Sequence, residues 1–315
     1  MAANLSCIVL LNDGNKVYSM DQALDPGNAT LWFTSTDSGN NIWCTDIASY
    51  NETNFTYVWL YNSQKDAIFE YTATTVSSPP TFIRKITGIP SSIWLNGLGV
   101  KDATTLIIGT DSNEILELDI SSPSNTVSVT TMFSMENPWN GNKLYCDGDI
   151  VYDSNGDRLY VTTQDKKIAG RNRYLVSYDD YSTLTGAGQL VPNNYSGAIF
   201  ARPANGMFVD SSTLWVIENG DVLNDPKPIV NPIFQNGTNN YQYEVCYGGV
   251  FCGGNDIYRI SGITTGGFYG QVNGSAQGDD CGFDGIPIYN MPTPTPTPSP
   301  VPPFRITVSR ACCWS

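Results

Sequence analysis

The sequence predicts an all-β fold, and three observations carry that prediction. Short apolar runs with period-2 alternation are common, and turns rich in Gly, Asn, Asp and Ser separate them. No window of apolar residues with helical spacing lasts three turns. The clearest example is 147–163, where an apolar run is followed by a Ser-Asn-Gly-Asp turn and by a strand with Leu159 and Val161 on one face. This pattern is typical of a β-hairpin.

The same hairpin pattern recurs along the chain, for example at 96–109 and at 205–217. Six units can be identified, with the paired strands centred on Ile8 and Val17, Val58 and Ile68, Leu106 and Ile115, Leu159 and Leu175, Leu214 and Val222, and Val245 and Ile257. Successive units begin roughly 50 residues apart, except the last, which follows sooner. A period of roughly 40 to 50 residues, each made of several short strands, predicts a β-propeller of about 5–7 blades.

In chain order, residues 7–11 are the first strand. No Lys or Arg precedes this short apolar run, so we expect no signal peptide, and no stretch is long and apolar enough to predict a membrane span. An outer strand is expected at 29–34 and an inner strand at 42–44. The second unit runs through 57–61 and 67–71 to 81–83. The glycine-rich segment after Gly248 is expected to hold the last blade and the closure of the ring, and the propeller spans 1–290.

Closure of such a ring commonly uses an N-terminal strand that completes the final blade. Cys7 lies in the first strand and Cys281 in the last irregular segment, so a bond between them would lock the seam. Cys246 and Cys252 could close a small loop. The eight cysteines lack zinc-site spacing, and the alternative for them is buried free thiols.

The C-terminal tail is a separate unit. The Pro/Thr-rich segment 291–303 predicts a polyproline II linker at ~3.1 Å per residue. Residues 304–315 follow as a terminal strand and attachment segment, with Phe304, Ile306 and Val308 on one face. We expect this strand to dock on a partner subunit, with Cys312 or Cys313 securing the contact. A disordered linker with an apolar end is the alternative.

Composition excludes several functions. The net charge of −14 disfavours nucleic-acid binding through a general basic face. The chain has no histidine, which removes Ser-His-Asp and Cys-His nucleophile arrangements, HExxH zinc sites and imidazole bases.

Candidate ligand contacts are few. The basic cluster in the longest recognisable hairpin loop could meet an anionic partner, or could be a solvated loop tip: Lys166, Lys167, Arg171 and Arg173. Trp139, in a loop between units, and Tyr195 could stack on sugar rings. For Trp59, Trp94 and Trp215, which are predicted inside strands, core packing is expected instead. No cofactor is expected, although Asp153, Asn155 and Asp157 resemble the start of a calcium loop without its later bidentate Glu, so a plain turn is the favoured interpretation.

Three motifs together resemble NHL-like propeller repeats. They are Gly148–Asp153 with Leu159, Tyr160 and Val161, the pair Tyr178 and Asp179, and Gly206–Phe208 with Leu214–Val216. Together with the Thr-Pro tract, the chain looks like surface or virion proteins of marine bacteriophages and other aquatic viruses, over roughly residues 90–300. It departs from even NHL spacing at the fourth hairpin loop and after residue 245. Enzymatic propellers such as lactonases hold a metal with inward carboxylates and a His-based acid/base, and no such set matches here residue by residue.

These observations favour a non-enzymatic structural or adhesive protein of a virion surface or other extracellular assembly. Its expected partners are other subunits, reached through the C-terminal arm, and a cell-surface glycan or receptor. The alternative is a secreted metal-dependent hydrolase of the lactonase kind that uses Asp and Glu at the propeller axis.

Overall fold

The computed structural model describes residues 7–13, 15–20, 30–37, 39–42, 44, 46–51, 56–62, 67–74, 78–137, 141–165, 172–195, 206–210, 213–218, 256–261, 265–271 and 283–287. In this part of the chain the regular elements are β-strands and one short 3-10 turn, η2 (Tyr181–Thr183). The all-β prediction is therefore confirmed.

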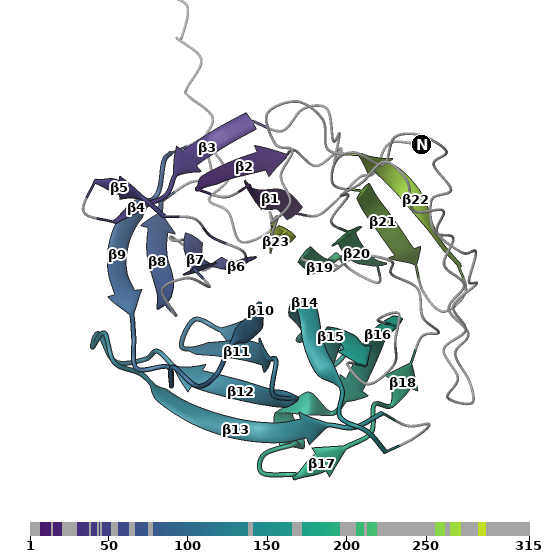
Figure 1. Cartoon of the computed structure of the whole chain (residues 1–315). Coiled ribbons are helices and arrows are strands. Elements are labelled where there is room, and N and C mark those ends of the chain that lie inside the picture. Colours follow the sequence, from purple (N-terminus) through teal and green to yellow (C-terminus); the bar gives the residue numbers. More distant parts are fainter. Residues whose placement is uncertain are drawn as a thin grey trace, which may run out of the picture.

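Five sheets of four or five strands are arranged around a common centre (Figure 1). In order from the innermost strand, the first contains β23 (Phe283–Pro287), β1 (Cys7–Asp13), β2 (Lys16–Met20) and β3 (Thr30–Thr34). The second contains β6 (Asp46–Asn51), β7 (Thr56–Asn62), β8 (Ala67–Ala73) and β9 (Thr81–Ile86). A small hairpin, β4 (Thr36–Asp37) with β5 (Asn40–Asn41), joins these two sheets.

The third sheet contains β10 (Leu95–Asp102), β11 (Thr105–Thr110), β12 (Glu114–Asp119), β13 (Ser128–Met135) and the parallel β17 (Gln189–Leu190). The fourth contains β14 (Tyr145–Asp153), β15 (Arg158–Asp165), β16 (Asn172–Asp179) and β18 (Asn194–Tyr195). The fifth contains β19 (Gly206–Asp210), β20 (Thr213–Glu218), β21 (Asp256–Ser261) and β22 (Thr265–Gln271).

Except for β17, which joins the edge of the third sheet, and β23, which joins the first sheet from the end of the described chain, the chain runs outward through each sheet and then crosses to the centre to begin the next. This is the architecture of a β-propeller. The inner strands pack in a closed series, β23 on β6, β6 on β10, β10 on β14, β14 on β19 and β19 on β23. The expected propeller fold is confirmed.

The ring closes where the N-terminal strand meets the last described strand. β1 pairs antiparallel with β23, from Cys7 opposite Pro287 to Leu11 opposite Phe283. Strands from both ends of the described chain thus share one sheet. The expected closure ran the other way, with an N-terminal strand in the final blade, whereas here β23 supplies the innermost strand of the first sheet. Cys281 and the side chain of Cys7 lie outside the described residues, as do Cys246, Cys252, Cys312, Cys313 and the whole tail 291–315.

The fifth and sixth hairpin units were predicted wrongly. β20 pairs with β19 on one side and β21 on the other, and Leu214 lies opposite Ile260. Both edges of β20 are therefore occupied, so the predicted pairing of Leu214 with Val222 is wrong. Ile257 belongs to the fifth sheet rather than to a sixth unit. The turn-like residues after Glu218 led to this error, because turn chemistry is local and does not identify the strand that returns.

The inner strand expected at 42–44 is also wrong. Ile42 and Cys44 lie outside the strands, and β6 begins at Asp46. Both side chains are fully buried, in an apolar cluster with Phe33 and Phe69. Their hydrophobicity therefore reflects burial between sheets rather than strand pairing.

Apolar clusters fill the spaces between neighbouring sheets. Trp59, fully buried, packs between the second and third sheets with Leu98 and Ile108, as expected for a core tryptophan. Phe133 and Tyr178 pack between the third and fourth sheets, with ring centroids 4.6 Å apart. Each large apolar side chain buried this way contributes ~1.5 to 3 kcal/mol to folding, so the sheets are held to one another mainly by these layers.

Candidate functional site

We call the face of the ring at which the inner strands β6, β10, β14 and β19 begin the start face. Three hydrogen bonds join neighbouring members of these four strands. Asp46 Oδ2, in the first residue of β6, accepts the N–H of Leu98 in β10 at 2.7 Å. Asn96 Nδ2 in β10 donates to the carbonyl of Cys146 in β14 at 2.9 Å, and the N–H of Met207 in β19 donates to Asp149 Oδ2 in β14.

Two buried aspartates act as latches between neighbouring inner strands. Asp46 and Asp149 are 2% and 1% exposed. Each also accepts the N–H of the residue that follows it, Ile47 at 2.8 Å and Ile150 at 2.6 Å. Each carboxylate thus bonds one N–H of its own strand and one N–H of the next sheet. Hydrogen bonds of this charged kind are shorter and stronger than neutral ones.

The latches alternate with glycines along the ring. Leu98 and Met207, which donate to the latches, follow Gly97 and Gly206 in the motifs Asn-Gly-Leu and Asn-Gly-Met. At Gly97 an added Cβ would lie 2.9 Å from Cys146 Sγ and 3.1 Å from the backbone of Asp149. At Gly97, the close approach of β10 to β14 therefore leaves little room for a side chain.

The thiol of Cys146 is enclosed by the same strands. It is fully buried, and burial raises its pKa well above the ordinary thiol value, helped by the nearby carboxylates of Asp149, Asp147 and Asp46. Burial also raises the pKa of Cys44 to about 12. Both are free thiols packed in the core, which matches the alternative interpretation for these two cysteines.

Trp139 and the basic residues Lys166, Lys167 and Arg171 lie outside the described residues, but their flanking residues meet at one place. The segments 138–140 and 166–171 begin after Asn137 and Asp165, which are both buried. Asn137 Nδ2 donates to Asp165 Oδ2 at 3.4 Å. The two candidate loops therefore start side by side.

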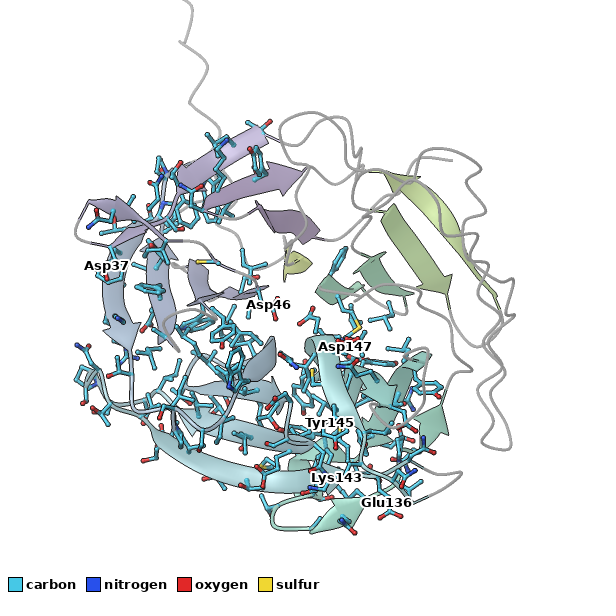
Figure 2. The ribbon with its side chains drawn as sticks, viewed as in Figure 1. Asp37, Asp46, Glu136, Lys143, Tyr145 and Asp147 are labelled. Atoms are coloured by element: carbon cyan, nitrogen blue, oxygen red, sulfur yellow. The ribbon has the colours of Figure 1, made fainter. Side chains whose placement is uncertain are left out.

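The loop that carries Trp139 stands on an ordered base. Glu136 and Lys143 form a β-bridge, and the N–H of Asn137 donates to the carbonyl of Asn142 at 2.7 Å. Figure 2 shows Glu136 and Lys143 near the rim, whereas Asp46 and Asp147 lie toward the centre. The base of this loop therefore lies near the rim, between the third and fourth sheets.

Two of the remaining sequence candidates lie on paired strands of the fourth sheet. Tyr195 lies in β18 opposite Val176, and Arg173 lies in β16 opposite Gln164, with both side chains outside the described set. Phe304, Ile306 and Val308 also lie beyond the described residues.

The calcium-like loop is a turn whose carboxylates bond within the protein. Asp153 Oδ1 accepts the N–H of Asn155 at 3.0 Å. Asp157 accepts the N–H of Ser182 at 2.9 Å, its hydroxyl at 2.6 Å, and the Tyr152 hydroxyl at 2.9 Å. The hydroxyl of Ser182 is the largest influence that lowers the pKa of Asp157. Asp157 thus anchors η2, and a search of the described residues finds no cluster of three or more His, Cys, Asp or Glu suited to a metal.

One surface residue was missed by the sequence analysis. Trp94 was expected inside a strand, but it precedes β10 and is 62% exposed. Its apolar neighbour Leu95 is buried, so the local pattern does resemble a strand. The preceding Gly88, Pro90, Ser91 and Ser92 were the available sign that this segment is a connection.

Within the part of the chain that is described, no helix has the length and hydropathy to cross a membrane. No protein-family model matches the chain, and no curated protein matches its sequence. Among solved structures, a chain of a nidogen/laminin complex is similar at 12% identity and a TM-score of 0.48, covering 88% of this chain and 97% of that one. The calcium-binding protein regucalcin from Agrobacterium tumefaciens aligns at 12% identity and a TM-score of 0.39, covering 71% and 68%. A computationally designed protein, Ika4, aligns at 12% identity and a TM-score of 0.31, covering 57% and 88%. With likeness this low, the propeller assignment rests on the strand order and register described above.

Proposed function

We propose that this chain is a non-enzymatic display module, a structural or adhesive propeller of a virion surface or other extracellular assembly. Its start face meets a glycan or receptor, and its C-terminal arm joins it to partner subunits. Trp139, Tyr195 and the basic residues Lys166, Lys167, Arg171 and Arg173 remain the proposed contact residues from the sequence.

The observation that carries this proposal is the use of the inner carboxylates. Asp46 and Asp149 are buried acids on the inner strands β6 and β14, the strands from which an axial hydrolase would draw its metal ligands or its acid/base pair. Both carboxylates already accept backbone N–H groups from two sheets. A catalytic role would compete with these bonds, and breaking a buried charge-assisted bond costs about 1.5 to 3 kcal/mol. Their geometry therefore supports a rigid scaffold.

The polarity of the ring also supports display. β23 ends at Pro287, opposite Cys7, at the face where the other inner strands end. The proposed tether follows Pro287 in the sequence, and the proposal assigns the start face to the ligand.

The alternative, a metal-dependent lactonase, has one observation in its favour, since the half-buried Asp147 lies toward the centre beside Asp46. The two functions can be separated with the full-length protein, by measuring bound metal and the hydrolysis of a lactone and ester panel. The display function predicts no turnover, no stoichiometric metal, and enrichment of the protein in purified extracellular particles over free medium. Stoichiometric calcium together with turnover that Asp147→Asn abolishes would establish the enzyme instead.

A further inference from the structure

Five large apolar side chains are exposed in the described part of the chain. Leu31, Phe82 and Ile83 lie on the outer strands β3 and β9, and Val191 follows the outer β17. Trp94 is the most exposed of the five, at 62%, and it is the one placed where an inner strand begins. A large aromatic ring left in water at the start face calls for an explanation.

The backbone that carries Trp94 is fixed on both sides. Its carbonyl accepts the N–H of Asp111, in the turn between β11 and β12, at 3.0 Å. The N–H of Ile93 donates to the carbonyl of Pro90 at 2.9 Å, which closes the turn before it. Leu95 then enters the sheet opposite Thr110 and is 4% exposed. The backbone that carries the indole is thus already ordered, so ligand binding there would cost little conformational entropy.

The surroundings of the indole are polar. Ser91 and Ser92 are exposed beside it. The bond from Asn96 to the carbonyl of Cys146 brings the start of β14, with the half-buried Tyr145 and Asp147, next to the start of β10. A single aromatic face among hydroxyl and carboxylate groups suits a sugar ring, which offers CH groups to the ring face and hydroxyls to its neighbours. A protein partner would bury about 800 Å² of surface on each side in a standard interface, with an apolar centre larger than a single indole ring.

From this arrangement we propose that the start face binds a neutral glycan and that Trp94 is the stacking platform. This inference rests on the display function and gives it a ligand class. The net charge of −14 argues against an acidic polysaccharide, because like charges repel before contact is made.

The test is binding of the full-length protein to soluble laminarin, mannan and dextran, with alginate as the anionic comparison, followed by calorimetry. At least one neutral polysaccharide should bind. Trp94→Ala should raise the dissociation constant about tenfold, since one aromatic stacking contact contributes about that factor to affinity. Trp94→Phe keeps an aromatic ring and should retain most of the affinity. Phe82→Ala is the matched control, because Phe82 is 41% exposed on the outer strand β9, and it should leave binding unchanged.

The proposal is overturned if none of the neutral polysaccharides binds, if Trp94→Ala binds as well as the unaltered protein, or if alginate is preferred. Loss of capture of a protein ligand in Trp94→Ala, without any polysaccharide binding, would assign the surface to a protein partner instead. None of these outcomes includes bound metal or hydrolysis of a lactone, which are the results that would contradict the display function. Failure of the glycan inference is therefore distinguishable from failure of the display function.

Discussion

At the scale of single residues, the buried latches show how one carboxylate joins two sheets. Asp149 accepts the N–H groups of Ile150 and Met207, and its own N–H donates to Thr162 Oγ1 at 2.7 Å. The side chain therefore completes the hydrogen bonding of backbone groups that the sheet ladders leave unused at the strand starts. A buried N–H without an acceptor costs about 1 to 3 kcal/mol, so the latch protects two such groups at once.

We predict that Asp149→Asn destabilises the protein by about 1.5 to 3 kcal/mol, because one amide nitrogen would then face a backbone N–H donor. Urea unfolding followed by circular dichroism measures this as a lower midpoint. Asp46→Asn should behave alike. Asp153→Asn, on an exposed turn, is the control and should change stability by no more than about 0.5 kcal/mol. Equal effects at positions 149 and 153 would show that the latch is not a special contact.

At the scale of elements, the packing of the third sheet on the fourth depends on a glycine that faces a sulfur atom. A Cβ at Gly109 in β11 would lie 2.4 Å from Cys146 Sγ and 2.8 Å from Cys146 Cβ. Real Cβ contacts are never so short, so the third and fourth sheets would have to separate to admit even one methyl group. This close approach links a residue of β11 to one of β14 across the boundary between sheets.

Gly109→Ala should therefore destabilise the protein by about 1 to 3 kcal/mol, as overpacked cores do. Combining it with Cys146→Gly removes both clashing atoms, so the double variant should be more stable than the sum of the single effects predicts, with a coupling of about 1 kcal/mol or more. The thermodynamic cycle is measured by denaturant unfolding of the four proteins. Strict additivity would mean that the backbone adjusts without strain.

The sequence predicted the strands well wherever alternation and a short turn coincide, as at 147–163. It failed where partner choice depends on distant residues. The strand after Leu214 was assigned to a nearby run, although the returning strand begins at Asp256. The latches could not be predicted from the sequence either, because no local feature of Asp149 indicates a hydrogen bond to Met207, 58 residues later. Trp94 was taken as core, since an apolar run does not tell which of its members faces water.

At the scale of the whole molecule, deletion of the tail and deletion of the closing strand should have different effects on stability and assembly. Deletion of 292–315 leaves β23 in place, so the shortened protein should melt cooperatively while losing assembly into particles or oligomers. Deletion of 283–315 also removes β23, exposes the edge of β1, and should lower the melting temperature and promote aggregation. Circular dichroism, thermal melts and size-exclusion chromatography distinguish the two proteins. If the protein that lacks 292–315 is unfolded, the tail belongs to the core and the proposal of a separate C-terminal arm is wrong.

The pairing of Cys7 with Pro287 has a consequence for how the molecule is made. β1 is synthesised long before its partner β23, so the ring stays open until residue 287 has left the ribosome. Because these two residues are neighbours in space, a short linker could join them and the chain could begin elsewhere. New ends at the tight turn between Asp102 and Thr105 would give a circular permutant in which the closing pair is made early and the seam moves to the third sheet.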